Sequence, residues 1–245
     1  MVVLVDIGNS NIVIARYDHR IEKITRFNTD RNKSTNEYMR LFRGLFDDVK
    51  HIVISSVVPE LNKVFRLISE EYNIPVMFVG PGVKTGVQIK IDNPKELGTD
   101  IVCDAAGAYK SYGNSVIVID MGTATTVTLS VNKVIKGVSI SAGLVTQKNA
   151  LIGRASQLSQ FEFIAPQKAI GTNSIDSLNC GLLLGHSCMI KGIVNQIKEE
   201  NNLDIPVIIT GGASIFMKEM LPSEFIFEPN LLIKGLIEIY HKNMK

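Results

Sequence analysis

Apolar residues in this chain fall into two recurring patterns. Runs rich in β-branched residues predict strands at residues 2–5, 51–58, 75–79, 116–119 and 206–210. Between these runs, apolar residues recur every three or four positions, which predicts amphipathic helices over residues 60–72, 101–112 and 174–197. Strands that alternate with helices predict an α/β fold built on mixed, mostly parallel sheets that are flanked by helices.

Two of the predicted strands lead into the same short motif. Residues 2–15 run from an apolar strand through Asp6-x-Gly8 and small polar residues into a second apolar strand, and residues 116–130 repeat this layout around Asp120-x-Gly122. Each copy predicts a β-hairpin whose polar tip can contact phosphate oxygens, with an aspartate able to hold a hydrated cation. A plain turn is the alternative for either copy alone. The repeat favours a ligand site and predicts two domains, 1–114 and 115–245.

Length and composition agree with two modest domains. The chain has 245 residues, of which 45% are hydrophobic and 20% charged, enough to build two α/β cores. The formal net charge is only +2, so we expect no nucleic-acid partner. Only four apolar residues follow Met1 before Asp6, too few for a signal peptide or a membrane span, so we expect a cytoplasmic protein without a membrane partner.

Cysteines and histidines do not show the spacing of a metal site. The three cysteines, Cys103, Cys180 and Cys188, form no C-x-x-C pair, which fits reduced thiols in the cytosol. The four histidines are far apart in the sequence, and we expect them, including His186, on the solvated surface.

A polar segment, residues 92–100, leads into the second predicted helix. Asp100 lies in its first turn, where the helix dipole favours an ionised carboxylate. Beside a phosphate site such a carboxylate is a candidate general base, and the alternative is a helix-capping acid without chemistry. Asp104 lies four residues further on, on the same helix face.

Small residues mark two further segments. Residues 136–143 predict a loop, followed by a helix to about residue 158. Gly211-Gly212 follows the strand at 206–210 and predicts a strand–turn–helix junction, where adenosine or phosphates could lie against a helix N-terminus. An ordinary turn between a strand and a helix is the alternative.

Together these motifs resemble the actin, hexokinase and Hsp70 ATPase superfamily, and more closely the type III pantothenate kinases. The resemblance is carried by DIGNSN (6–11), ISSVVP (54–59), DNPKELGTD (92–100), DMGTATT (120–126), TGG (210–212) and the closing residues 232–240. It implies duplicated actin-like (ribonuclease H-like) domains and ATP-dependent phosphorylation of the pantothenate hydroxyl, the first step of coenzyme A biosynthesis. It also implies a homodimer, which the long apolar helix after residue 174 favours as well.

The resemblance also implies roles for individual residues. Asp100 is the implied base that takes the proton of the substrate hydroxyl. The implied ATP-binding residues are Asp6, Ile7, Gly8, Asn9, Ser10, Asn11, Ile12, Val13, Gly122, Thr123, Gly211 and Gly212. The implied pantothenate-binding residues are Gly98, Thr99, Asp100, Ile101 and Ser174. Asp120 is expected to hold a monovalent cation, K⁺ or NH₄⁺, and Asp6 is expected to contact the Mg²⁺ of ATP through water.

The chain departs from the family pattern around the substrate. Ile101 stands where the family usually has an arginine that meets the pantothenate carboxylate, and Lys148 and Arg154 are the nearest cations that could replace it. The other departures are Asp104 for asparagine, Thr172 for a basic residue, Ser141-Ala142-Gly143 for a Pro-Gly and Ser159 for proline. Two alternatives therefore stay open: a kinase of the same fold for a less anionic alcohol, and a nucleotide-binding relative that is accessory or regulatory.

Overall fold

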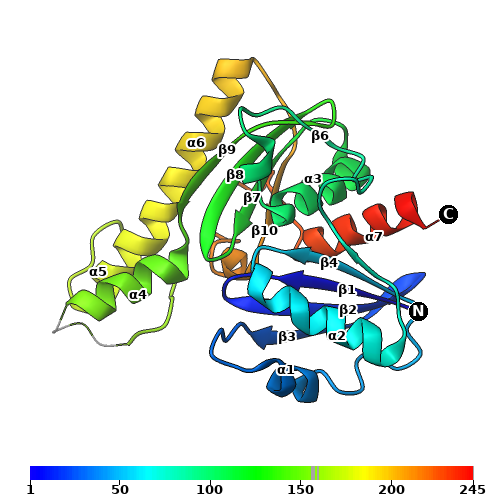
Figure 1. The fold of residues 1–245 in the computed structure, drawn as a ribbon. Coiled ribbons are helices and arrows are strands. Elements are labelled where there is room, and N and C mark those ends of the chain that lie inside the picture. The colour runs from blue at the N-terminus through cyan, green and yellow to red at the C-terminus, as the bar shows by residue number, and fades with distance from the viewer. Residues whose placement is uncertain (156–157, 159, 245) are drawn as a thin grey trace. The chain divides into compact units, whose positions relative to one another are not determined.

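The structure is a computed structural model that describes residues 1–155, 158 and 160–244 (Figure 1). Ser159 lies outside the described residues. The chain divides into two compact units, one made of Met1–Ser111 with Leu231–Lys245 and the other of Tyr112–Asn230. The last helix, α7 (Leu231–Asn243), thus joins the first unit, which differs from the expected contiguous domains 1–114 and 115–245.

The first unit is built on a mixed sheet. Its strands are β1 (Val2–Ile7), β2 (Asn11–Asp18), β3 (Arg20–Asn28), β4 (His51–Ser56) and β5 (Val76–Phe78). They lie in the order β3-β2-β1-β4-β5. The pairs β1–β2 and β2–β3 are antiparallel, while β1–β4 and β4–β5 are parallel. The opening hairpin therefore continues directly into a parallel sheet.

Alternating residues of β1 fill a core on each face of this sheet. Val3, Val5 and Ile7 pack in one core with the helices α1 (Thr35–Leu41) and α2 (Asn62–Tyr72), and a 3₁₀ turn, Pro59–Leu61, precedes α2. Val2 and Leu4 pack in a second core with α3 (Thr99–Tyr112) and α7. This second core includes Ile233, Leu236 and Ile239 of α7, which is the physical reason that α7 belongs to the first unit.

Helices α3 and α7 meet at two glycines. A Cβ on Gly235 would collide with the backbone of Cys103, and a Cβ on Gly107 would lie 2.9 Å from the Gly235 nitrogen. The two backbones are therefore in contact, which only glycine allows.

Between β5 and α3 the chain contains the short strand β6 (Gln88–Ile89) and a 3₁₀ turn, Pro94–Glu96.

The second unit repeats the strand order of the first. Its corresponding strands are β7 (Val116–Met121), β8 (Ala124–Val131), β9 (Val134–Ala142), β10 (Val207–Thr210) and β11 (Ile226–Phe227). Within this unit they run β9-β8-β7-β10-β11. The first two pairs are antiparallel and the last two parallel, as in the first unit. The expected duplicated α/β fold is confirmed.

The loop predicted at residues 136–143 was wrong, because residues 136–142 belong to strand β9 and Gly143 is the N-cap of the helix that follows. The glycine and serines of β9 are poor strand formers, and their small size suggested a loop. Pairing along the whole length of β8, from Val131–Val134 to Ala124–Ala142, outweighs that local preference.

The helices of the second unit are α4 (Leu144–Arg154), α5 (Ser174–Asn179) and α6 (Gly185–Asn201), with a π-helical turn, Cys180–Leu184, joining the last two. Helix α4 ends at Arg154, before the expected position near residue 158. Within the described residues, the run Ser174–Asn201 is long and apolar enough to cross a membrane by length and composition alone. It packs Leu183, Ile190 and Val194 into the core of its unit, as a core helix does.

Candidate functional site

The tip of the first hairpin, residues 8–11, is braced by the segment that follows β3. The Thr29 N–H donates to the Ser10 carbonyl at 2.9 Å, and the Thr29 hydroxyl donates to the Gly8 carbonyl at 2.7 Å. Two tip carbonyls are therefore held from outside. The peptide planes of the tip are fixed before any ligand arrives, which is what a backbone phosphate site requires.

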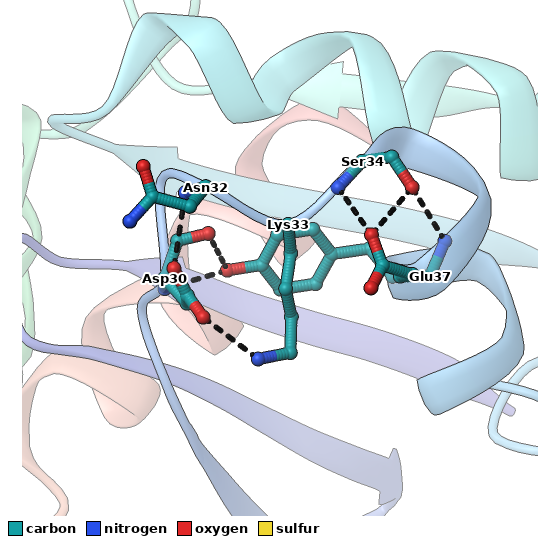
Figure 2. Close-up of polar contacts among 6 residues, drawn as sticks. Asp30, Asn32, Lys33, Ser34 and Glu37 are labelled. Carbon is teal, nitrogen blue, oxygen red and sulfur yellow. Dashed lines mark hydrogen bonds and ion pairs between the residues drawn. The ribbon is translucent and has the colours of Figure 1, made fainter.

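The bracing segment is itself fixed by a network around Asp30 (Figure 2). Tyr38 accepts from the Asp30 N–H at 2.7 Å and donates to the Asp30 carbonyl at 2.9 Å. The Asp30 carboxylate accepts from the Asn32 N–H at 3.0 Å and from the Lys33 ammonium at 2.8 Å, and the Lys33 contact lowers its pKa. Helix α1 begins directly after this segment, with a capping box in which Ser34 and Glu37 bond to each other's backbone N–H.

Side chains at the first tip divide into buried and exposed ones. Ile7 and Ile12 are both fully buried, so any ATP contact they make uses the backbone. Asn9 and Ser10 are exposed, and Arg31 donates to the Asn9 side-chain oxygen at 2.7 Å. The first tip thus offers backbone groups and short polar side chains to a phosphate.

The parallel pairing of β1 with β4 places Asp6 beside Ser55. The Ser55 hydroxyl contacts the Thr99 hydroxyl at 3.1 Å. Thr99 Oγ1 also accepts from the Ser56 N–H at 3.0 Å and donates to the Ser56 carbonyl at 3.1 Å. A hydroxyl has one proton and two lone pairs, and these three contacts use them all. Thr99 therefore ties the start of α3 to the end of β4, and its hydroxyl has nothing left for a substrate.

Asp100 follows Thr99 in the first turn of α3. Its Oδ1 accepts from the Ile101 N–H at 2.8 Å, and burial raises the pKa of its carboxyl. A Cβ on Gly98 would collide with this carboxylate, so Gly98 makes room for it. Asp104 is only 3% exposed, whereas Asp100 is partly exposed. Asp100 is thus the more accessible of the two acids, with a basicity raised toward neutral pH.

The tip of the second hairpin, Gly122 and Thr123, is braced in the same way as the first. The Thr123 carbonyl accepts from the Gly143 N–H at 3.0 Å and from the Thr146 hydroxyl at 2.7 Å. Any Cβ on Gly143 would collide with the carbonyls of Gly122 and Thr123. In both units the segment after the third strand, β3 or β9, supplies one N–H and one threonine hydroxyl to the tip. The duplication therefore extends to the support of each tip.

Gly211 lies against the second hairpin. It adopts φ of +89°, and a Cβ there would collide with the Asp120 carboxylate and the Met121 backbone. Gly212 is exposed and begins a 3₁₀ turn, Gly212–Phe216. The helix at this junction is therefore a 3₁₀ helix of five residues, which carries little of an α-helix dipole. The backbone of Gly211 nevertheless lies close to Asp120.

A model of the type III pantothenate kinases matches residues 2–196 of the chain. The chain belongs to the type III pantothenate kinase family. A type III pantothenate kinase from Halalkalibacterium halodurans is 37% identical over 254 residues, covering 100% of both chains. The expected kinase family is confirmed.

Solved structures support the fold. A protein from Campylobacter jejuni, described as a Baf family transcriptional activator, matches with a TM-score of 0.68 and 20% identity over 98% of both chains. Another from Sinorhizobium meliloti, described as a 2-dehydro-3-deoxygalactonokinase, matches with a TM-score of 0.61 and 11% identity over 100% of this chain and 99% of that one. At such identities the likeness concerns architecture alone.

Residues expected to meet pantothenate in this kinase family lie in both units. Ser174 is exposed at the first position of α5, after the N-cap Asn173, and Thr172 is exposed just before it. Ile101, in α3 of the first unit, is 9% exposed and brings no charge. Binding of the pantothenate carboxylate therefore requires a cation from another position of the chain.

Of the two candidate cations, Lys148 is already engaged. Its ammonium donates to the Phe161 carbonyl and lies 4.7 Å and 5.0 Å from the ring centroids of Phe161 and Phe163. Arg154 is exposed at the end of α4 and contacts no described residue through a hydrogen bond or ion pair. Arg154 is the better candidate.

One polar residue of the second unit was missed. The expectation that His186 is solvated was wrong, because only 2% of it is exposed. It contacts Thr125 in the second hairpin and Gln147 in α4, and so links the hairpin to this helix. The signal was present in the spacing: Leu182, His186 and Ile190 are four residues apart, which places them on one helix face.

The first prediction concerns Thr99. Thr99→Val leaves the Ser56 N–H without its acceptor, at a cost of about 1–3 kcal/mol in the free energy of unfolding. It also loosens Asp100, so we expect kcat to fall more than the pantothenate KM changes. Thr99→Ser keeps the hydroxyl and is the control. Steady-state kinetics and urea unfolding of both variants test this, and a normal kcat for Thr99→Val would contradict the positioning role.

A second prediction concerns Asp100→Asn, with Asp92→Asn on the exposed loop as control. We expect turnover to fall at least about 100-fold in Asp100→Asn alone. If it falls by less than about threefold, Asp104 becomes the better base.

The same variant tests the raised pKa of Asp100. The pKa of Asp100 in the folded chain lies above its value of about 3.9 in the unfolded chain. The free energy of unfolding of the wild type therefore declines as the pH rises from the unfolded pKa through the folded pKa. Asp100→Asn lacks this decline. Urea unfolding across acidic and neutral pH measures the difference. Parallel stability curves for wild type and Asp100→Asn would show that Asp100 has an ordinary pKa.

Proposed function

We propose that the chain transfers the γ-phosphoryl group of ATP to the hydroxyl of pantothenate, giving 4′-phosphopantothenate in coenzyme A biosynthesis. Membership of the type III pantothenate kinase family supports the reaction. The observation that carries the proposal is Asp100, a partly exposed carboxylate of raised pKa at the start of α3, for which Gly98 leaves space and whose Oδ1 accepts from the Ile101 N–H.

The residues act by positioning and by neutralising charge, which is most of what phosphoryl transfer needs. Backbone groups of the two tips, residues 8–11 and 122–123, bind ATP phosphates, and Gly211 and Gly212 allow close approach of the nucleotide. Asp100 accepts the proton of the pantothenate hydroxyl as its oxygen attacks. A base of this kind contributes about 10²- to 10⁴-fold to the rate.

Cations fit the oxygen donors of the two hairpins. No cluster of three or more His, Cys, Asp or Glu that could hold a metal occurs within the described ranges, so a metal here depends on ATP for most of its ligands. Single carboxylates suit that arrangement: Asp6 would contact Mg²⁺ through water, and Asp120 would hold K⁺ or NH₄⁺. When bound, these cations would neutralise the negative charge of the ATP phosphates.

One alternative is a kinase of the same fold that acts on a less anionic alcohol, because the buried, uncharged Ile101 cannot pair with a substrate carboxylate. Retention of Asp100 argues against a non-catalytic accessory or regulatory relative, since a binding module needs no base. An ADP-release assay with pantothenate, with neutral pantothenol and without acceptor separates these functions. We expect release with pantothenate above all. Equal rates with pantothenol would favour the less anionic alcohol, and ATP binding without turnover would favour the accessory protein.

We also propose a cytoplasmic location, without nucleic-acid or membrane partners. The net charge of +2 and the packing of Ser174–Asn201 into a core support this proposal.

Homodimerisation is proposed from exposed apolar residues of the second unit. Among the described residues, five aliphatic residues of α4, α5 and the segment between them are exposed: Val145 at 41%, Leu151 at 44%, Ile164 at 63%, Ile170 at 80% and Ile175 at 48%. A high number of exposed aliphatic side chains on consecutive elements favours an interface. A second copy is the proposed occupant, since the family resemblance implies a dimer.

For the dimer we predict that Ile164→Asp combined with Ile175→Asp yields a monomer in sedimentation at micromolar concentration. Ile140→Asp, at a 68% exposed position on β9, is the control and should stay dimeric. A wild type that sediments as a fully active monomer would refute the proposal.

A prediction about Ile101 follows from its lack of charge. An arginine paired with a carboxylate in a partly buried site contributes about 1.5–3 kcal/mol, or roughly 10- to 150-fold in affinity. Ile101→Arg should therefore lower the pantothenate KM about tenfold or more and leave the ATP KM unchanged. A flat KM in Ile101→Arg together with a raised KM in Arg154→Ala would show that Arg154 has taken over. If neither variant matters and pantothenate stays a poor substrate, pantothenate is the wrong substrate.

A further inference from the structure

His186 lies at the start of α6, directly after the π-helical turn, and is almost completely buried. Its Nε2 is 2.9 Å from the Thr125 hydroxyl, and its Nδ1 is 3.1 Å from Nε2 of Gln147. Thr125 is 1% exposed and follows the second tip in β8, while Gln147 lies in α4. One imidazole thus contacts both the hairpin and the helix that braces it.

The orientation of the Gln147 amide is fixed by a third contact. Its Nε2 also lies 2.8 Å from the Ala142 carbonyl, which can only accept a hydrogen bond. The NH₂ group must therefore occupy this position, because a flipped amide would set two oxygens against each other. The amide nitrogen has two protons: one goes to Ala142 and the other to His186.

This contact determines where the imidazole carries its proton. Since Gln147 donates to Nδ1, that nitrogen has to be the unprotonated acceptor, and Nε2–H donates to Thr125. Burial also lowers the pKa of His186, which agrees with a neutral ring. Protonation at Nδ1 would place an N–H against an N–H in a buried setting.

The histidine acts on the tip through α4. Gly143 and Thr146, just before Gln147, hold the Thr123 carbonyl, as described above. A neutral, correctly protonated His186 therefore holds the first turns of α4 to Thr125, and α4 in turn fixes the tip. If this link opens, both donors to Thr123 can move with α4.

We propose that His186, as the neutral tautomer protonated at Nε2, is a positioning residue that keeps α4 docked on the second tip in the geometry for phosphate binding. The inference rests on the proposed role of this tip in ATP binding. His186 touches no reacting atom, so its effect is on nucleotide affinity rather than on proton transfer.

Nitrogen NMR of protein labelled with ¹⁵N-histidine tests the tautomer in the unaltered chain, with His186→Phe identifying the signal. We expect a protonated Nε2 and an unprotonated Nδ1 at neutral pH. Gln147→Glu replaces the donor with an acceptor and should move a proton to Nδ1. Gln167→Glu, the same change at an exposed glutamine, should leave the spectrum unchanged. Protonation of Nδ1 in the wild type would overturn the proposal.

Titration with MgATP and steady-state kinetics test the consequence for the tip. We expect His186→Phe and Gln147→Glu to weaken ATP binding about tenfold, with the pantothenate KM changed less than about threefold. Normal ATP affinity in a folded His186→Phe would overturn the positioning role. A wild type that binds no ATP would instead refute the proposed function, while the tautomer result stands separately. If His186→Phe fails to fold, the spectrum of the wild type and the Gln147→Glu titration decide the question.

Discussion

The parallel strand pairs β1–β4 and β7–β10 determine where the polar groups of each unit lie. Parallel strands end at the same edge, and ligands of α/β sheets bind outside those ends. Here the registers place Asp6 beside Ser55 and Asp120 beside Thr210. Each unit therefore brings an aspartate, a hydroxyl residue and a hairpin tip to one edge. The chemistry differs only because the segments added to that edge differ.

The segments that each unit places at this edge of its sheet determine the function of that unit. The first unit adds the start of α3, where Thr99 is bonded to the β4 end and Asp100 follows. In the second, Gly211 lies directly against Asp120 and leaves the edge open for a ligand. Both add a bracing segment after the third strand that holds tip carbonyls through two hydrogen bonds, worth about 0.5–1.5 kcal/mol each. Fixing the tips in advance lowers the ordering cost when a nucleotide binds.

Much of this arrangement could be predicted from the sequence, because strong local patterns determine it. The two Asp-x-Gly hairpins and the helix that carries Asp100 follow from alternation and helical spacing. Strand β9 was missed because its small residues are poor strand formers, and only pairing with β8 makes it a strand. Helix α7 joins the first unit through contacts at Gly107 and Gly235 that lie more than a hundred residues apart in the sequence. A buried histidine such as His186 gains its partners only in the folded unit.

We propose that each tip, residues 8–11 and 122–123, is a preformed backbone site for ATP phosphates. Hydrogen–deuterium exchange of the amides at residues 8–11 and 122–124, with and without a non-hydrolysable MgATP analogue, tests it most directly. We expect both tips to exchange more slowly when the analogue is bound, while the amides of the exposed residues 167–170 do not change. Protection of one tip alone, or of neither, at saturating analogue would contradict it.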